Sequence, residues 1–170
     1  TGADTVNSGA GGDVIFTGTG NDSIVAGSGN DAITVASGNK NIDAGEDNDV
    51  VNFIDGSLDS LDTVEGGAGY DVIKVNVISD ANTGSDFANV TSFDELAFTT
   101  ATSGVLNATT SAIPVGINTY TFEGGINGDT ALRNVSNPVT VNLVNGTSAA
   151  TDDLEISQID TGADTVNLVV

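Results

Sequence analysis

Residues 8–34 read SGAGGDVIF, TGTGNDSIV and AGSGNDAIT, which are three consecutive units of nine residues. Each unit has Gly at its second and fourth positions, Asp at its sixth and Ile at its eighth. A short repeat of fixed period is typical of a solenoid, in which each coil buries its apolar side chains against its neighbours. The sequence therefore predicts a coiled fold before any single residue is given a role.

The same phase extends well beyond these three units. The sixth positions of eight units are Asp4, Asp13, Asp22, Asp31, Lys40, Asp49, Asp62 and Asp71, with four extra residues before Asp62. The eighth positions are all β-branched, namely Val6, Ile15, Ile24, Ile33, Ile42, Val51, Val64 and Ile73. Residues of this kind favour strands, so we expect one short strand in each unit, with a single inward side chain at the eighth position.

The remaining positions of each unit favour turns. They are rich in Gly, Asn, Ser and Asp, which adopt turn and left-handed backbone conformations readily. A strand and a turn in every nine residues make a flattened coil with two units to the circuit. Each residue n should then stack on residue n+18, with neighbouring strands about 4.8 Å apart.

Such stacking creates an electrostatic problem. The chain has a formal net charge of −21, and aspartates one circuit apart would form columns of like charge. Calcium suits such columns, because it accepts about six to eight oxygen ligands from carboxylates and backbone carbonyls. Magnesium demands stricter geometry and suits them less. The alternative is a plain solenoid whose turns merely favour Gly, Asn and Asp, but such turns would also accept Asn or Ser at the sixth position.

The composition excludes several classes of function. The chain has no His or Cys and only three Lys and Arg against 24 Asp and Glu. Zinc fingers, catalytic triads and thiol nucleophiles are therefore excluded, and we expect no nucleic-acid partner. No apolar run approaches the roughly 18 residues of a membrane span, so we expect no membrane insertion. Pairs such as Asp94 and Glu95 could be read as a glycosidase acid and base, but 24 acids make such pairs unavoidable, and we expect no enzyme.

Residues 66–74 read GGAGYDVIK, which fits the pattern G-G-x-G-x-D-x-U-x, where U is a large aliphatic residue. This unit, and the three units in residues 8–34, resemble the RTX nonapeptide repeat of secreted bacterial proteins. The resemblance implies a parallel β-roll over residues 1–75 that binds several calcium ions. In that family each ion lies between one turn and the turn two units later. The first turn gives the carbonyls of its second and fourth residues and its Asp, and the later turn gives the carbonyls of its first and third residues and its Asp.

Carried onto this sequence, the resemblance implies the following ligands. One site pairs Gly9, Gly11 and Asp13 with Ala26, Ser28 and Asp31. Another pairs Gly27, Gly29 and Asp31 with Ala44, Glu46 and Asp49. A truncated site pairs Gly2 and Asp4 with Thr17, Thr19 and Asp22. Asp49 could also meet Asp71 if the insertion at residues 53–56 is looped out, while the role of Asp62 stays open.

One position departs from the family pattern. The site that would join Gly18, Gly20 and Asp22 to the next turn meets Lys40 where a carboxylate is expected. We expect no metal at this position. Instead, the Lys40 ammonium should lie beside Asp22 as an internal cation.

Residues 76–170 lose the nonapeptide and are rich in Thr, Asn, Val and Ser. Alternating stretches predict strands at residues 94–99, 119–122, 139–144, 154–156 and 166–170. Turns are expected at Asn127-Gly128, Asn137-Pro138 and Asn145-Gly146. The predicted fold class is therefore all-β, with a parallel β-roll that continues into an irregular right-handed β-solenoid. Residues 161–167 repeat residues 1–7, so Asp164 could begin another calcium array.

The Thr- and Asn-rich second half resembles segments of bacterial surface-layer proteins and large adhesins. The expected function is thus structural: a calcium-stabilised segment of a secreted surface-layer protein on the bacterial cell surface. It would fold on extracellular calcium and self-associate into a lattice or bind another surface partner. The alternative is a calcium-binding module of an adhesin or of an enzyme exported by type I secretion.

Overall fold

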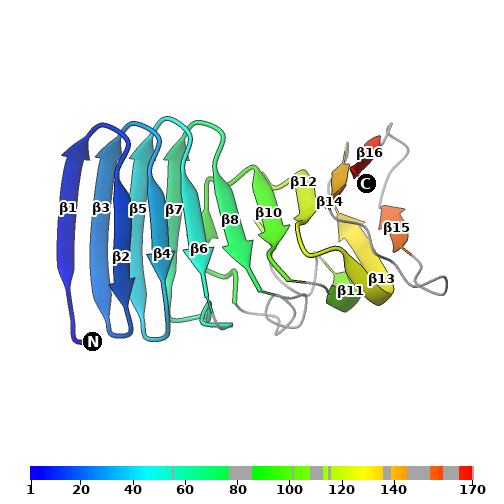
Figure 1. The fold of residues 1–170 in the computed structure, drawn as a ribbon, viewed down its shortest axis with the longest axis horizontal. Helices are drawn as coiled ribbons and strands as arrows, with labels where there is room; N and C mark the ends of the chain where they lie inside the picture. The colour runs from blue at the N-terminus through cyan, green and yellow to red at the C-terminus, as the bar shows by residue number, and fades with distance from the viewer. Residues whose placement is uncertain are drawn as a thin grey trace.

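The computed structural model describes residues 1–54, 56–76, 86–100, 102–107, 113–114, 116–135, 139–144, 154–158 and 165–169. Among these residues there is no helix, and so none that could cross a membrane. All strand pairs in the described part are parallel. The predicted all-β, parallel solenoid is therefore confirmed (Figure 1).

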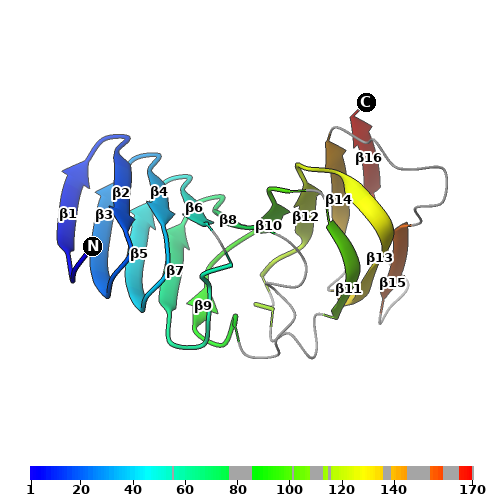
Figure 2. The same ribbon diagram turned by 60° about the horizontal axis from the view of Figure 1, so that its bottom comes forward.

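The strands form three sheets. The first contains β1 (Thr5–Ala10), β3 (Asp22–Ser28), β5 (Lys40–Glu46), β7 (Thr63–Ala68) and β9 (Val90–Thr91). The second contains β2 (Val14–Gly18), β4 (Ala32–Val35), β6 (Val50–Phe53), β8 (Val72–Val75), β10 (Glu95–Phe98), β12 (Thr119–Phe122), β14 (Thr140–Val144) and β16 (Thr165–Val169). The third contains β11 (Thr102–Asn107), β13 (Ile126–Val135) and β15 (Leu154–Gln158). Up to β10 the chain alternates between the first two sheets, which lie face to face (Figure 2).

The stacking register matches the repeat. Ile24 pairs with Val6 on one side and with Ile42 on the other, a step of 18 residues each way. Across the insertion the step grows, and Ile42 pairs with Val64. The insertion is accommodated between β6 and β7, so the strands on both sides of it keep their pairing. This confirms the expected stacking of residue n on residue n+18.

The interior holds more than the expected single ladder. The eighth-position residues from Ile15 to Ile73 are buried as predicted. A second buried column lies two residues further along each strand and contains Thr17, Ala26, Val35, Ala44, Phe53 and Val75. The expectation of one inward side chain per unit was therefore wrong, because successive side chains of a strand alternate between its two faces.

The second half continues the same sheet. β8 pairs with β10, and β10, β12, β14 and β16 follow in parallel, with the rings of Phe98 and Phe122 stacked 5.1 Å apart. The predicted strands in this half are confirmed within one or two residues at their ends. The division of the chain at residue 75 stays a prediction, since sheet pairing passes through it.

The turn expected at Asn127-Gly128 was wrong, because both residues lie within β13. Thr102 of β11 pairs with Ile126, but Gly104 pairs with Thr130, so the extra residues of β13 form a bulge there. Asn127 and Gly128 thus lie in a strand that pairs with β11 on one side and β15 on the other, although their local sequence favours a turn. The turns expected at Asn137-Pro138 and Asn145-Gly146, and the expected role of Asp164, lie outside the described residues.

Candidate metal-binding edges

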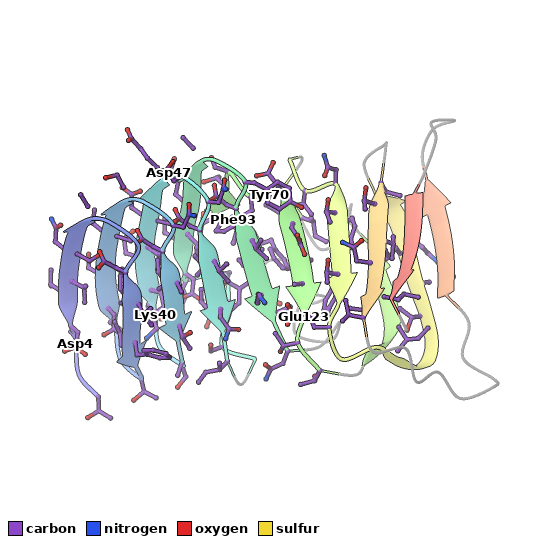
Figure 3. All side chains as sticks on the ribbon, turned by 45° about the horizontal axis from the view of Figure 1, so that its top comes forward. Asp4, Lys40, Asp47, Tyr70, Phe93 and Glu123 are labelled. Carbon is purple, nitrogen blue, oxygen red and sulfur yellow. The ribbon has the colours of Figure 1, made fainter. Side chains whose placement is uncertain are left out.

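The roll has two edges at which the sixth-position residues gather. Along the first edge lie the turns after β1, β3, β5 and β7, which end at Asp13, Asp31, Asp49 and Asp71. Along the second edge lie the turns after β2, β4 and β6, which end at Asp22, Lys40 and Asp62. Figure 3 labels Asp47 and Tyr70 on the first edge and Asp4 and Lys40 on the second. Since the sixth and eighth positions share one face of a strand, the sixth-position side chains point inward.

Backbone hydrogen bonds stack the carboxylates of the first edge into one column. The Asp13 N–H donates to Oδ1 of Asp31 at 2.7 Å, and the Asp31 N–H donates to Oδ1 of Asp49 at 2.8 Å. The Asp49 N–H donates to Oδ1 of Asp71 at 2.8 Å, across the insertion. The insertion is therefore looped out on the second edge, and Asp49 does meet Asp71.

The other carboxylate oxygen of each residue in this column has no partner. Oδ2 is buried without a hydrogen bond in Asp13, Asp31, Asp49 and Asp71. Burial is the main cause that raises the pKa of Asp49 to about 6 from an ordinary 3.8, and the charges of Asp71 and Asp31 add to it. Burial also raises the pKa of Asp71. A buried, unpaired carboxylate oxygen costs free energy, so this column is suited to a cation.

Backbone carbonyls lie between the same turns. A Cβ atom built on Gly27, where φ is +114°, would lie 1.9 Å from the Gly9 carbonyl oxygen. The Gly27 carbonyl approaches Gly45 in the same way, at 1.9 Å. Only Gly leaves this space free, so the second-position carbonyls are held between successive turns. At the fourth position Asp47 takes the role of Gly with φ of 77°, and its carbonyl oxygen approaches Gly69.

The donor set of the first edge fits calcium. Carboxylate and carbonyl oxygens are the ligands that calcium prefers, and both kinds lie between each pair of successive turns. In the described part of the chain no group of three acidic side chains converges on one point. The two complete sites of the sequence analysis both lie on this edge. The same pattern adds a third, which pairs Gly45, Asp47 and Asp49 with Gly66, Ala68 and Asp71. The assignment of individual ligands stays a prediction.

The column ends beyond Asp71. The Asp71 N–H donates to Asp94 Oδ2 at 3.0 Å, so the carboxylate stack continues by one residue. However, the turn that carries Asp94 is shorter. Glu65 pairs with Thr91 and Val72 pairs with Glu95, so the three residues 92–94 replace the six residues 66–71. This turn contains the buried Phe93 instead of the Gly-rich sequence.

The second edge contains an ion pair in place of the orphaned oxygens. Lys40 Nζ donates to Asp22 Oδ2 at 2.7 Å, and both side chains have an exposed fraction of 0%. Although burial alone would raise the pKa of Asp22, the hydrogen bonds from Lys40 and from the Asp4 N–H hold it below its ordinary value. The prediction that the Lys40 ammonium lies beside Asp22 is confirmed.

The other acids of the second edge differ from those of the first. Asp62 accepts the Lys40 N–H at Oδ1 and the Asp59 N–H at Oδ2, at 2.6 Å and 2.8 Å. Burial raises the pKa of Asp62. Asp4 is exposed, and its N–H donates to Asp22 Oδ1 at 3.0 Å. The structure thus brings Asp4 to Asp22, but both Asp22 oxygens are engaged. The truncated site with Gly2, Thr17 and Thr19 stays a prediction.

A parallel solenoid with stacked carboxylates and closely approaching carbonyls along one edge has the donor groups that a cation-binding β-roll requires. Residues 1–33 and 59–74 match the family model of the RTX calcium-binding nonapeptide repeat, in four copies. These two stretches of the roll therefore contain RTX calcium-binding repeats. Residues 34–58, which include Lys40 and the insertion, lie outside the match. No curated protein and no solved structure matches the chain.

Proposed function

We propose that the chain is a structural segment of a secreted bacterial surface-layer protein, that it folds and assembles on extracellular calcium, and that it has no catalytic role. RTX repeats are typical of secreted proteins, which supports a place outside the cell. The observation that carries the proposal is the column of buried Oδ2 atoms in Asp13, Asp31, Asp49 and Asp71.

Calcium would supply positive charge and ligand-binding energy where the fold has brought carboxylates together. Binding at tenfold excess over the dissociation constant stabilises a fold by about 1.4 kcal/mol per site, so three sites give about 4 kcal/mol. That amount approaches the entire stability of many small domains, about 5–15 kcal/mol. At low calcium the chain, with its net charge of −21, would be held open by its own repulsion. This behaviour suits export of an unfolded chain.

The outward face of the second sheet supports the assembly part of the proposal. Its outward residues on β2, β4, β6 and β8 include no acid: Val14, Phe16, Ala32, Thr34, Val50, Asn52, Val72 and Lys74. Val14 and Phe16 are 71% and 73% exposed. Because the rest of the molecule carries a large negative charge, this face is where a second copy can approach with the least repulsion.

Removal of calcium tests the folding part. Far-ultraviolet circular dichroism should show loss of β-structure when a chelator is added and recovery when calcium returns. A spectrum that does not change would refute the calcium-dependent fold.

Electron microscopy of the calcium-loaded protein tests the surface-layer part. Calcium-dependent two-dimensional lattices would support it. A monodisperse monomer at all calcium concentrations would refute assembly and favour a module of an adhesin or of an exported enzyme.

A further inference from the structure

We propose that Lys40 is a permanent internal counter-ion that replaces one calcium ion, so that this roll binds calcium along its first edge and not at the Lys40 position. The inference rests on the proposed calcium-dependent fold and specifies which edge depends on calcium.

The Lys40 ammonium contacts the groups that would bind a metal ion at this position. Lys40 Nζ lies 2.6 Å from the Gly20 carbonyl oxygen, 3.0 Å from the Gly18 carbonyl oxygen and 2.7 Å from Asp22 Oδ2. These are, in the same order, the fourth-position carbonyl, the second-position carbonyl and the sixth-position carboxylate of one turn. On the first edge, the equivalent three groups are the predicted calcium ligands of that turn. A carbonyl of the next turn, that of Ser37, is 3.5 Å away. The ammonium therefore occupies the space between turns that a metal ion would need.

The charge of the Lys40 ammonium balances its site as a calcium ion would balance a pair of carboxylates. Two carboxylates and one calcium ion sum to zero, and so do one carboxylate and one ammonium. Replacing a sixth-position Asp by Lys changes the local charge by two units, which equals the charge of the ion that is lost. Since Asp22 and Lys40 are both fully buried, this neutrality matters for stability.

The carboxylates of the second edge also differ from those of the first edge in their hydrogen bonds. No carboxylate oxygen on this edge is among the buried atoms without a partner in the described residues, whereas four on the first edge are. Asp62 is satisfied by two backbone N–H groups, one of them from Lys40 itself. Lys40 thus neutralises the carboxylate before it, and its backbone binds the carboxylate after it.

The substitution Lys40→Asp restores the residue that the repeat expects and tests the inference by ion count. Native mass spectrometry of the full chain during a calcium titration should show one more bound ion in Lys40→Asp than in the unmodified chain. The matched control is Lys74→Asp, which makes the same charge change on the outward face of β8, where Lys74 pairs with Glu123. The control should bind the same number of ions as the unmodified chain. A folded Lys40→Asp protein with no added ion would overturn the inference.

Amine acetylation tests the same point without a variant. In the calcium-loaded chain, the buried Lys40 should resist an acetylating reagent at a concentration that modifies Lys74, which is 25% exposed. Equal modification of both lysines would overturn the inference. This experiment uses the unmodified chain, so its result counts even if Lys40→Asp does not fold. Failure of the proposed function gives a different result, in which the unmodified chain binds no calcium at all.

Discussion

A single position in the repeat decides how each edge of the roll is neutralised. Because the sixth and eighth positions point to the same side of a strand, each sixth-position side chain is carried into the interior along with the apolar ladder. An Asp there can leave a buried oxygen without a partner, as in Asp31 and Asp49, and such an oxygen favours a nearby cation. A Lys there brings its own cation, as Lys40 does beside Asp22.

The acidity of Asp49 predicts how the calcium-free protein responds to pH. Burial raises the pKa of Asp49 in the folded state to about 6, above its ordinary value of 3.8. The folded chain then binds a proton more tightly than the unfolded chain, so acidification from pH 7 to pH 5 stabilises the calcium-free fold. This stability is lost as the pH rises through about 6. We expect far-ultraviolet circular dichroism in chelator to show more β-structure at pH 5 than at pH 7, and less β-structure at pH 5 would contradict the assignment.

Shared ligands predict unequal effects along the first edge. Asp49 belongs to two of the three predicted sites, while Asp13 belongs to one. Asp49→Asn should therefore lower the calcium count by two and Asp13→Asn by one, as measured by native mass spectrometry. Asp43→Asn is the control, because Asp43 is exposed on β5 and points away from the interior. Equal counts for Asp49→Asn and Asp43→Asn would show that the column does not bind calcium.

At the scale of the strand and turn, close approach between coils restricts the glycines. Gly27 and Gly11 have similar φ values, +114° and +111°, but only Gly27 has a carbonyl oxygen within 2 Å of the Cβ position. Gly11→Ala should cost about 1–2 kcal/mol for its left-handed backbone. Gly27→Ala should cost about 1–3 kcal/mol more, because backbone must move. Urea unfolding in calcium measures both, and equal losses would contradict the close stacking of the turns.

Much of the first half was predictable at this scale, because its repeat is strict. The strands, the step of 18 residues and the Lys40 pair all followed from phase alone. The second inward column was missed, since its members range from Ala26 to Phe53 and show no common residue type. The third site was predicted only as a meeting of Asp49 with Asp71. Its carbonyl ligands depend on where the insertion leaves the coil, and Asp47 does not resemble the glycine that it replaces.

In the second half the local signals were weaker. The turn predicted at Asn127-Gly128 failed because pairing of β13 with β11 and β15 outweighs the preference of two residues. The strands β11 and β13 were not predicted, because their sequences do not alternate clearly between apolar and polar residues. Ser92 and Phe93, which shorten the last turn of the first edge, carried no signal that the array ends there.

At the scale of the whole molecule, charge separates two faces of the roll. The outward face of β2, β4, β6 and β8 carries no acid, while Asp43 and Glu65 lie on the outward face of the first sheet. The molecule therefore has one face that another copy can meet without strong repulsion, and this face is uncharged apart from Lys74.

We expect Phe16 to contribute to self-association through the outward face of β2, β4, β6 and β8. Phe16→Asn removes a large exposed apolar side chain from β2 and should weaken self-association in calcium, as measured by sedimentation velocity. Val25→Asn is the matched control, because Val25 is exposed on β3 in the opposite sheet and should leave association unchanged. Assembly of Phe16→Asn at the same concentration as the unmodified chain would exclude this face.

The central claim is that calcium lies between the stacked carboxylates of the first edge. Anomalous diffraction from calcium-grown crystals, recorded at long wavelength, would locate the ions directly. We predict three peaks along the first edge, between Asp13 and Asp31, between Asp31 and Asp49, and between Asp49 and Asp71, with none beside Lys40. A first edge without peaks, or a peak between Asp22 and Lys40, would contradict it.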